Sequence, residues 1–208
     1  MKTPHNSQNK VAAVFGATGL VGKELVKLLI EDDTYSKVKL ITRREITLTN
    51  PKAEIILLED FSQLLSVESK IAADVYFICT GTTIKKAGTK VNFRKTDYEL
   101  PVTIAKCAQK LNVKQMVIIS SIGANISSSN FYLHTKGEME QGVTKEYTGV
   151  LNFIRPSLLL GEREESRTGE HIASLIMRLV GWVMIGPLKS YRGVNAAEVA
   201  RQMVAFTK

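Results

Sequence analysis

The feature that most constrains the fold is a glycine-rich turn between an apolar run and a helical segment, in AVFGATGLVG at residues 13–22. The apolar run over residues 11–15 is typical of a strand that is buried on both faces. Gly16 permits a tight turn, Gly19 lets the backbone approach a pyrophosphate at the helix N-terminus, and Gly22 lets the helix pack closely. The spacing is GxxGxxG rather than GxGxxG, and glycine triplets also occur in ordinary turns. The strand–turn–helix context favours a dinucleotide site.

Strand-like runs and helical segments alternate along the rest of the chain. Further strands are expected at residues 37–42, 54–59, 74–80, 115–120 and 150–155. Helices are expected from Leu20 onward and over residues 92–111, 131–144 and 195–206, with Pro101 as a kink or break and Asn195 as an N-cap. This alternation predicts an α/β class, doubly wound Rossmann fold with a mainly parallel sheet and helices on both faces. Such sheets bind ligands beyond the carboxyl ends of their strands.

Length and composition indicate one globular domain over residues 1–208. With 44% hydrophobic and 23% charged residues, the chain does not resemble a disordered one. Its two cysteines, Cys79 and Cys107, lie in apolar surroundings, which favours free thiols in a reducing compartment. The apolar stretch 172–188 is interrupted by Arg178 and Pro187, so no membrane span is expected. The start of the chain is polar, and the cytoplasm is the predicted location.

Nucleic acid and metal ions receive little support as ligands. The net charge is +8, but lysines and arginines are spread along the chain and form no familiar nucleic-acid motif. A basic nucleic-acid or membrane-surface protein is therefore the least favoured interpretation. His5, His134 and His171 lack metal-ligand spacing, so no metal site is expected.

The end of the second predicted strand indicates which dinucleotide is bound. An NAD site usually has an acidic residue there, whereas an NADP site has an arginine near the 2′-phosphate. Here the strand ends in Thr42, Arg43 and Arg44, with no acid at the expected point. Two guanidinium groups can form charge-assisted hydrogen bonds to a phosphate, so NADP(H) is predicted in preference to NAD(H). The alternative is a solvated arginine pair.

A tyrosine and a lysine four residues apart suggest proton-transfer chemistry. Tyr132 and Lys136 share a face of the predicted helix, where an ammonium group stabilises a phenolate. Ser120 and Ser121 end the fifth strand, and a serine hydroxyl there can orient a substrate oxygen. The pattern YxxxK alone also fits a half-exposed tyrosine beside a surface lysine. His134 points to another face and is expected to be structural or on the surface.

These motifs together resemble the atypical short-chain dehydrogenase/reductase superfamily, whose members are NAD-dependent epimerase/dehydratase-like. The motifs are GATGLVG, the serine pair, YxxxK and FIRPSLLLGERE, and the likeness covers almost the whole chain. More narrowly, SSIGANISSSNFYLHTKGEME followed by RPSLLLGEREESRTGE resembles the Tat-interacting-protein-like oxidoreductases and their bacterial relatives. The resemblance implies a Rossmann fold, NADP(H) and a Ser–Tyr–Lys set.

The resemblance also implies a role for individual residues. The pyrophosphate loop would consist of Gly16, Thr18, Gly19, Leu20 and Val21, and the 2′-phosphate would meet Arg43 and Arg44. The adenosine side would be bordered by Cys79, Thr80, Gly81 and Thr82, and the segment near the nicotinamide would begin at Arg155 and Pro156. Tyr132 would be the acid/base, Lys136 its tuner and ribose ligand, and Ser121 the partner of the substrate oxygen, with Ser120 as the alternative.

One departure from the extended members of the superfamily is a short C-terminal part. Only residues 161–208 follow the sixth strand, and we expect a small substrate cap with one apolar helix at about 169–181 and a closing helix. Met177, Trp182 and Met184 would line the pocket, belong to the core or form a homodimer face. The predicted function is an NADP(H)-dependent oxidoreductase acting on a small carbonyl or hydroxyl substrate. The alternative is an NADPH-sensing regulatory protein with little or no turnover.

Overall fold

The centre of the molecule is a six-stranded sheet. The structure, a computed structural model, describes residues 9–157, 159–160 and 194–208. The strands are β1 (Lys10–Phe15), β2 (Tyr35–Thr42), β3 (Ala53–Leu57), β4 (Val75–Ile78), β5 (Gln115–Ile119) and β6 (Val150–Ile154). Their order is β3-β2-β1-β4-β5-β6 and every neighbouring pair is parallel. This is the Rossmann order, with its switch point between β1 and β4. The predicted α/β fold is confirmed.

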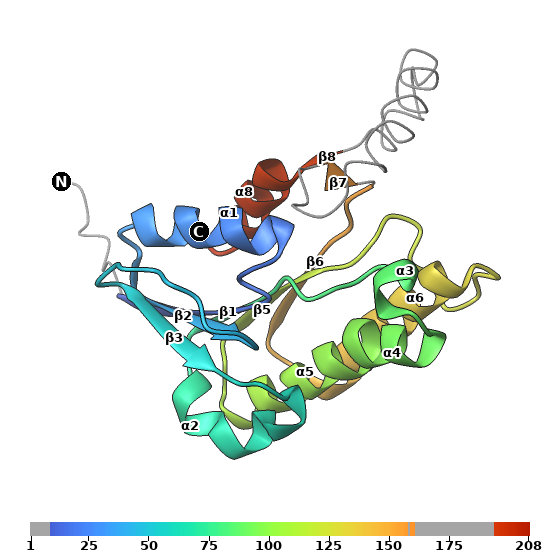
Figure 1. Cartoon of the computed structure of the whole chain (residues 1–208), viewed down its shortest axis with the longest axis horizontal. Helices are drawn as coiled ribbons and strands as arrows, with labels where there is room; N and C mark the ends of the chain where they lie inside the picture. The colour runs from blue at the N-terminus through green and yellow to red at the C-terminus, as the bar shows by residue number, and fades with distance from the viewer. Residues whose placement is uncertain (1–8, 158, 161–193) are drawn as a thin grey trace, which may run out of the picture.

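One face of the sheet is covered by α1 (Leu20–Glu31) and α8 (Ala196–Ala205), which lie side by side (Figure 1). Both helices pack on the sheet through one apolar core cluster. The predicted N-cap of the last helix is confirmed, since the Asn195 side chain accepts a hydrogen bond from the Ala197 N–H at 2.9 Å. Thr207, which follows α8, has its Oγ1 2.7 Å from the Tyr35 hydroxyl, and this contact anchors residues 206–208 to β2.

The other face is covered by α5 (Leu100–Lys110), α6 (Phe131–Glu146), the 3₁₀ helix η1 (Phe61–Val67) and α2 (Glu68–Ile71) (Figure 1). No helix was expected between the third and fourth strands, where η1 and α2 lie. Leu64 and Ile71 of these two short helices are fully buried. Both faces of the sheet are therefore covered, which explains why the central strand segments at residues 11–15 and 75–78 are continuous apolar runs rather than alternating ones.

The single helix expected over residues 92–111 is wrong in detail, because the structure divides this stretch into three parts. They are α4 (Lys90–Arg94), the π-helical turn η2 (Lys95–Glu99) and α5, preceded by the short α3 (Ile84–Ala87). The Leu100 N–H donates to the Lys95 carbonyl, which is the wider π spacing. In a regular helix the Pro101 ring would clash with the carbonyl of Asp97, four residues earlier. The expected break at Pro101 thus takes the form of a widened turn just before it.

The described C-terminal part adds a two-stranded parallel sheet of β7 (Leu159–Leu160) and β8 (Val194–Asn195). The apolar helix expected at 169–181, and with it Met177, Trp182 and Met184, lies outside the described residues. Within the described part of the chain, no helix is long and apolar enough to cross a bilayer.

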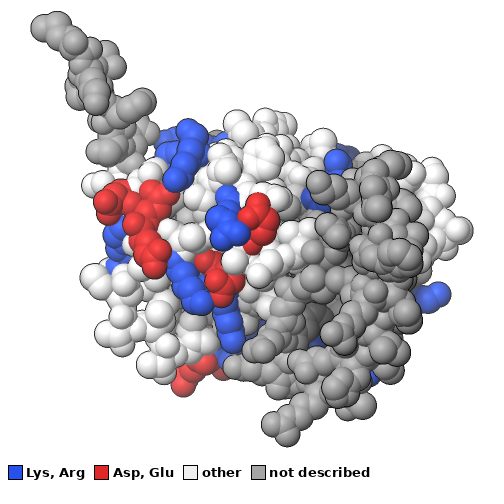
Figure 2. All heavy atoms as spheres, turned by 90° about the horizontal axis from the view of Figure 1, so that it is seen from above, with Lys and Arg blue, Asp and Glu red and all other residues white. Residues whose placement is uncertain are grey.

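The surface over α1 and α8 carries acidic and basic side chains interspersed rather than one sign of charge (Figure 2). Several of them form ion pairs at the surface, namely Lys27–Glu24, Arg201–Glu198 and Lys208–Asp32. Surface pairs of this kind contribute little to stability, but they lower the local net field. Neighbouring charges therefore compensate one another on this face.

Candidate functional site

The predicted site residues gather at one edge of the sheet. The glycine turn follows β1, the arginine pair follows β2, residues 79–82 follow β4 and the serine pair follows β5. Because all six strands are parallel, their carboxyl ends meet at the same edge. The structure therefore brings together segments that are separated by up to a hundred residues in the sequence.

The three glycines of the turn differ in what requires them. Gly16 has φ of +83°, and a Cβ there would lie 2.8 Å from the carbonyl carbon of Cys79. A Cβ on Gly22 would lie 2.1 Å from the Gly16 carbonyl oxygen. The protein itself therefore excludes side chains at these two positions. Gly19 and Thr18 are exposed, and a Cβ on Gly19 would meet nothing closer than 3.3 Å.

The N-terminus of α1 is suited to an anion. Gly19 is its N-cap and supplies no side-chain cap, and the first turn has no acidic residue. The first N–H groups of a helix have no partner within the helix, and the helix dipole favours negative charge beside them. The Val21 side chain is only 4% exposed and belongs to the core, so this residue can offer a ligand only its backbone.

The end of β2 places two cations at the same edge. Arg43 and Arg44 are both exposed, and the Arg43 guanidinium lies 5.8 Å from the centre of the Phe61 ring. The preceding Thr42 is buried. The arginines are thus accessible at the point where a 2′-phosphate was predicted to bind.

The loop after β4 is tied to a buried carboxylate that sequence reasoning missed. The Thr82 N–H donates to Asp97 Oδ2 at 2.9 Å. Asp97 Oδ1 lies 2.7 Å from the Lys136 ammonium, and the two residues are only 1% and 4% exposed. A signal for Asp97 was available, since it occupies a position between Phe93 and Ile104 on the apolar stripe of its helical segment.

The helix α6 carries the predicted tyrosine–lysine pair one turn apart. Its N-cap Asn130 accepts hydrogen bonds from the backbone N–H groups of Tyr132 and Leu133, at 3.0 and 3.2 Å. The Tyr132 ring is half-buried and packs at 5.8 Å from the Phe93 ring. Lys136 points inward to Asp97, so it is not the surface lysine of the alternative interpretation.

The other side of α6 meets the loop that follows β5. His134 is half-buried at the surface of this helix, with Nε2 3.4 Å from a Glu138 carboxylate. A Cβ on Gly137 would lie 2.4 Å from the backbone of Asn125 and Ile126. Gly137 therefore lets the loop press against the helix next to Lys136, which the sequence pattern did not indicate.

The two serines end β5 in different environments. Ser120 is 3% exposed, and its N–H continues the sheet by donating to Ile154 O at 2.7 Å. The Ser121 hydroxyl donates to the Ile122 carbonyl at 3.3 Å. Ile118 belongs to the core cluster beneath α6, so strand alternation directs Ser120 toward the helix that carries the tyrosine–lysine pair. Both serines remain candidates for the substrate contact.

Three buried hydroxyl oxygens at this edge have no hydrogen-bond partner among the described residues. They are Thr42 Oγ1, Thr80 Oγ1 and Ser120 Oγ, at the ends of β2, β4 and β5. Buried polar groups without partners are uncommon in folded proteins. Together with the cradle at Gly19 and the open helix N-terminus, they fit a long ligand that is polar along its length and anionic, such as a dinucleotide.

The predicted contribution of Cys79 is limited to its backbone. Its thiol lies 3.8 Å from the Met203 sulfur and packs against the apolar core, and burial raises its pKa well above the ordinary value. Burial also raises the pKa of Cys107 to about 11. Neither thiol is therefore a reactive thiolate near neutral pH. The described residues contain no cluster of three or more histidine, cysteine, aspartate or glutamate side chains that could hold a metal.

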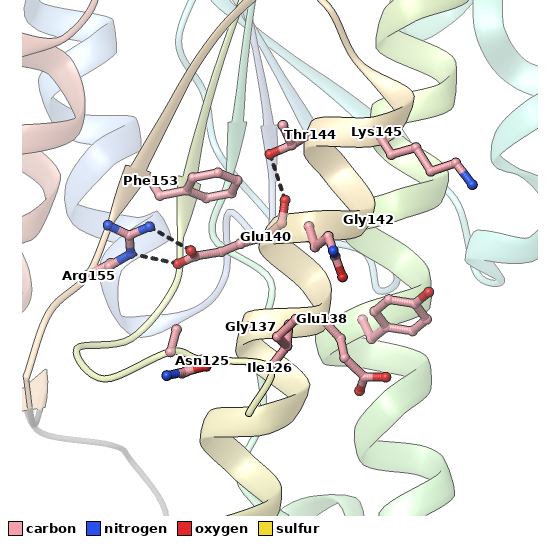
Figure 3. Close-up of a pocket in the computed structure, with 13 residues that line it drawn as sticks. Asn125, Ile126, Gly137, Glu138, Glu140, Gly142, Thr144, Lys145, Phe153 and Arg155 are labelled. Carbon is pink, nitrogen blue, oxygen red and sulfur yellow. Dashed lines mark hydrogen bonds and ion pairs between the residues drawn. The ribbon is translucent and has the colours of Figure 1, made fainter. Parts of the chain in front are cut away.

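Arg155 follows β6, and its side chain points toward Glu140 of α6. Its guanidinium forms a two-pronged pair with Glu140 at 2.8 and 2.6 Å, and it lies 5.9 Å from the centre of the Phe153 ring (Figure 3). These residues line an open hollow with Asn125 and Gly137, and Tyr132 and Lys136 are not among its described lining residues. The Pro156 carbonyl accepts from the Ile122 N–H at 3.0 Å. The Arg155 side chain is thus separated from the other predicted site residues.

Comparisons with known proteins agree with this geometry. The model of a family described as NAD(P)H-binding matches residues 16–159. "Protein FMP52, mitochondrial" of Candida albicans is 34% identical over 202 residues, which cover 94% of this chain and 86% of that protein. "Protein HTATIP2" of Rattus norvegicus is 37% identical over 172 residues, which cover 80% of this chain and 69% of that protein. The fold is also similar to the crystal structure of the Bordetella bronchiseptica enzyme WbmH in complex with NAD+, with a TM-score of 0.68 and 16% identity over 94% of this chain and 71% of that one.

The relatives correct one prediction. The C. albicans relative and five further fungal relatives carry the word mitochondrial in their names. The prediction of a cytoplasmic location is therefore wrong. It rested on free cysteines and a polar start, and free cysteines indicate a reducing environment without identifying the compartment.

Proposed function

The chain belongs to the NAD(P)H-binding family, and on that premise we propose that it is an NADP(H)-dependent oxidoreductase acting on a small carbonyl or hydroxyl substrate. It has an NAD(P)-binding, oxidoreductase-like Rossmann fold. The observation that carries the proposal is the buried Lys136, one helical turn after Tyr132 and at the carboxyl edge where the glycine turn lies. A lysine removed from water needs a specific reason, and proton transfer at Tyr132 supplies one.

The cofactor would be held mainly by backbone groups and by two arginines. The N–H groups at the start of α1 would bind the pyrophosphate, close to Gly19, which leaves the approach free of a side chain. Arg43 and Arg44 would bind the 2′-phosphate, because exposed guanidinium groups form charge-assisted hydrogen bonds to phosphate. An uncharged ribose hydroxyl would gain much less from these arginines, and we therefore propose NADP(H) rather than NAD(H).

The reaction would divide into hydride and proton transfer. When bound, the reduced nicotinamide supplies the hydride that a carbonyl carbon accepts. The Tyr132 hydroxyl would donate its proton to the carbonyl oxygen, and the Lys136 ammonium would stabilise the phenolate that remains. Oxidation of a hydroxyl substrate would return the proton to Tyr132. Each direction transfers one hydride and one proton.

A serine at the end of β5 would orient the carbonyl oxygen. Ser121 is the residue that the family resemblance implies, and Ser120 is the alternative, whose hydroxyl has no partner among the described residues. Alanine variants at the two positions form a matched pair, because both residues are buried and differ by one position. The variant with the larger loss of turnover identifies the serine that contacts the substrate.

The first test is an equilibrium titration of the purified protein with NADPH and with NADH. We expect the protein to bind NADPH more tightly than NADH. Arg43→Ala should remove this preference by lowering the affinity for NADPH and leaving the affinity for NADH unchanged. Arg201→Ala is the matched control, because it deletes an exposed arginine on α8 that pairs with Glu198. Equal affinity for both cofactors in the wild type would contradict the assigned preference, and a lack of binding to either would contradict the proposed function.

The second step measures turnover. Aldehydes, ketones and quinones are each added to the protein with NADPH, and the oxidation of NADPH is followed by the loss of its absorbance. We expect Tyr132→Phe to bind NADPH with normal affinity but to lose at least about a hundredfold in turnover, which is the usual contribution of an acid/base group. NADPH binding without turnover of any carbonyl would favour the sensing alternative.

A further inference from the structure

We propose that the substrate is a carbonyl compound with a negative charge of its own, and that Lys90 binds its anionic group. This inference rests on the proposed function and deepens it by naming the class of substrate. The Lys90 ammonium lies 5.1 Å from the centre of the Phe131 ring, and Phe131 directly precedes Tyr132 on α6. A cation is thus held next to the residue proposed to donate the proton.

The ring of Phe93 connects this lysine to the tyrosine. Phe93 is fully buried, and the centre of its ring lies 5.7 Å from that of Phe131 and 5.8 Å from that of Tyr132. Lys90 and Phe93 both belong to α4 and are three residues apart, so they are neighbours on the helix surface. The aromatic rings therefore fix the start of α4, and Lys90 with it, against the start of α6 (Figure 1).

The Lys90 ammonium has no hydrogen-bond acceptor or acidic partner within the described part of the chain. Its side chain is exposed, and the face of the Phe131 ring is its contact there. An ammonium group has three N–H donors, and a ring face attracts its charge without supplying an oxygen atom to accept them. A carboxylate or phosphate group of a substrate would supply such oxygens.

The segments that follow β1, β4 and β5 at the site contain no acidic residue. These acid-free stretches are residues 16–23, 79–96 and 120–137. The acids that come next after the last two stretches, Asp97 and Glu138, are already paired with Lys136 and Arg94. No carboxylate of these segments can therefore neutralise Lys90, which favours an anion that comes from a ligand.

Lysines at the opposite edge of the sheet differ in this respect. Lys114, which precedes β5, lies 3.0 Å from the Asp74 carboxylate, and Lys52, which precedes β3, lies 3.6 Å from the Asp33 carboxylate. The amino ends of the strands thus carry cations together with their counter-charges. At the carboxyl ends the cation beside Tyr132 has no such partner among the described residues.

The phosphates of the cofactor do not account for Lys90. The proposed pyrophosphate site follows β1 and the proposed 2′-phosphate site follows β2, whereas α6 follows β5. In the sheet, β4 separates β5 from β1 and β2. Lys90 therefore lies on the side of Tyr132, where the carbonyl group would react, rather than on the side of the phosphates.

The test compares the turnover of matched aldehydes that differ in charge. The substrates are meta- and para-carboxybenzaldehyde, each measured against its own uncharged carboxamide, with the full chain and NADPH. For at least one of the two acids we expect kcat/KM to be about tenfold higher than for its amide, because a local positive field concentrates an anion at the site. Added salt should reduce this advantage by screening, while turnover of the amide stays the same.

Lys90→Gln should raise KM for the acid about fivefold, the upper end for an exposed ion pair, and should leave kcat unchanged. The constants for the amide and the affinity for NADPH should stay at the wild-type values. Lys90→Arg should keep the preference for the acid, because it keeps the charge and the contact with the ring. Circular dichroism checks that each variant is folded.

Lys145→Gln is the matched control. It removes an equal charge from the last turn of the same helix that carries Tyr132, about 20 Å along the axis from Phe131. This separation exceeds the screening length of about 10 Å at moderate salt, so the kcat/KM for the acid should stay within about twofold of the wild type.

Equal kcat/KM for acids and amides in the wild type would overturn the inference, as would a Lys90→Gln protein that keeps the full preference for the acid. Turnover of neutral carbonyls but of neither carboxybenzaldehyde would also overturn it. A loss of NADPH affinity in Lys90→Gln would assign the lysine to the cofactor instead. These outcomes leave the proposed function intact. A wild type that reduces no carbonyl, or binds neither NADPH nor NADH, would overturn the proposed function together with this inference.

Discussion

Substitution of Gly22 by alanine should destabilise the protein, against the intrinsic preference of a helix. Within a helix, glycine to alanine ordinarily stabilises by about 0.5–1 kcal/mol. Here the new Cβ would lie 2.1 Å from the Gly16 carbonyl oxygen, about 0.9 Å inside the 3.0 Å that Cβ atoms essentially never cross. The obstacle is backbone, so α1 and the glycine turn must separate. Overpacking of this kind costs about 1–3 kcal/mol, and the upper end applies because no side chain can rotate away.

The expected net loss is about 2 kcal/mol, once the helix preference is subtracted from the overpacking cost. For a chain of 208 residues this lowers Tm by about 4–8 °C. Urea denaturation followed by circular dichroism measures the free energy of unfolding, and a thermal scan measures Tm. A Gly22→Ala protein as stable as the wild type, or more stable, would refute the close approach of helix and turn.

Gly19→Ala is the matched variant, and it should show the opposite pattern. Its Cβ would lie 3.3 Å from the Gly16 oxygen and 3.9 Å from the Cys79 oxygen, and alanine in place of glycine at an N-cap costs about 1 kcal/mol or less. We expect its NADPH affinity to fall about tenfold, because a methyl group would intrude between the helix N-terminus and the pyrophosphate. Unchanged NADPH affinity in Gly19→Ala would contradict the assignment of this glycine to the ligand.

Two further predictions concern stability. Burial raises the pKa of Tyr35 from 10.0 to about 12, so the folded state holds the phenolic proton more tightly than the unfolded state does. The free energy of unfolding should therefore fall as the pH rises from about 10 to 12. Tyr35→Phe should reduce this alkaline decline, measured as the urea midpoint at each pH. At neutral pH Tyr35→Phe should cost about 1 kcal/mol through loss of the contact with Thr207. Asn130→Ala should lower the free energy of unfolding by about 1 kcal/mol because it removes the N-cap of α6. Asn130→Asp should keep the wild-type stability, because aspartate also has an oxygen that can cap the helix. An Asn130→Ala urea midpoint equal to that of the wild type would contradict the cap.

The sheet was predictable from the sequence because strands buried on both faces are continuous apolar runs. The runs around Val14, Phe77 and Ile118 are short and apolar, which is typical of buried strands, and apolar residues at helical spacing lie between them. Strand ends were less predictable. The fourth strand ends at Ile78 rather than at Thr80, because the next two residues form the loop on which Gly16 packs. That contact is between backbones distant in the sequence, and no local pattern reports it.

The short helices η1 and α2 were not predicted, for a related reason. Among the side chains of these helices that the structure describes, Leu64 and Ile71 are fully buried, and two such residues seven positions apart define no period. The π-helical turn was seen only as a break, because a proline in a helical segment signals interruption without specifying its form. Local pattern therefore identifies elements that bury several side chains and misses those that bury one or two.

The candidate site divides along the same line between local and long-range information. Tyr132 and Lys136 were identified because helical spacing places them on one face and because a serine pair at the end of a predicted strand precedes them. Asp97 was missed because its partners, Thr82 and Lys136, lie 15 and 39 residues away. A polar residue on an otherwise apolar stripe is nevertheless a local sign that a partner exists elsewhere, since a buried carboxylate without one is unstable.

The glycine turn shows how structure refines a motif into separate requirements. Packing alone explains Gly16 and Gly22, since a side chain at either position would collide with backbone. Packing does not explain Gly19, which is exposed at the open end of a helix. A ligand is therefore needed to account for only one of the three glycines. Because the other two would be present in a turn that binds nothing, the case for a cofactor depends on three features. They are Gly19, the hydroxyl groups at the same edge that have no partner among the described residues, and the buried Lys136.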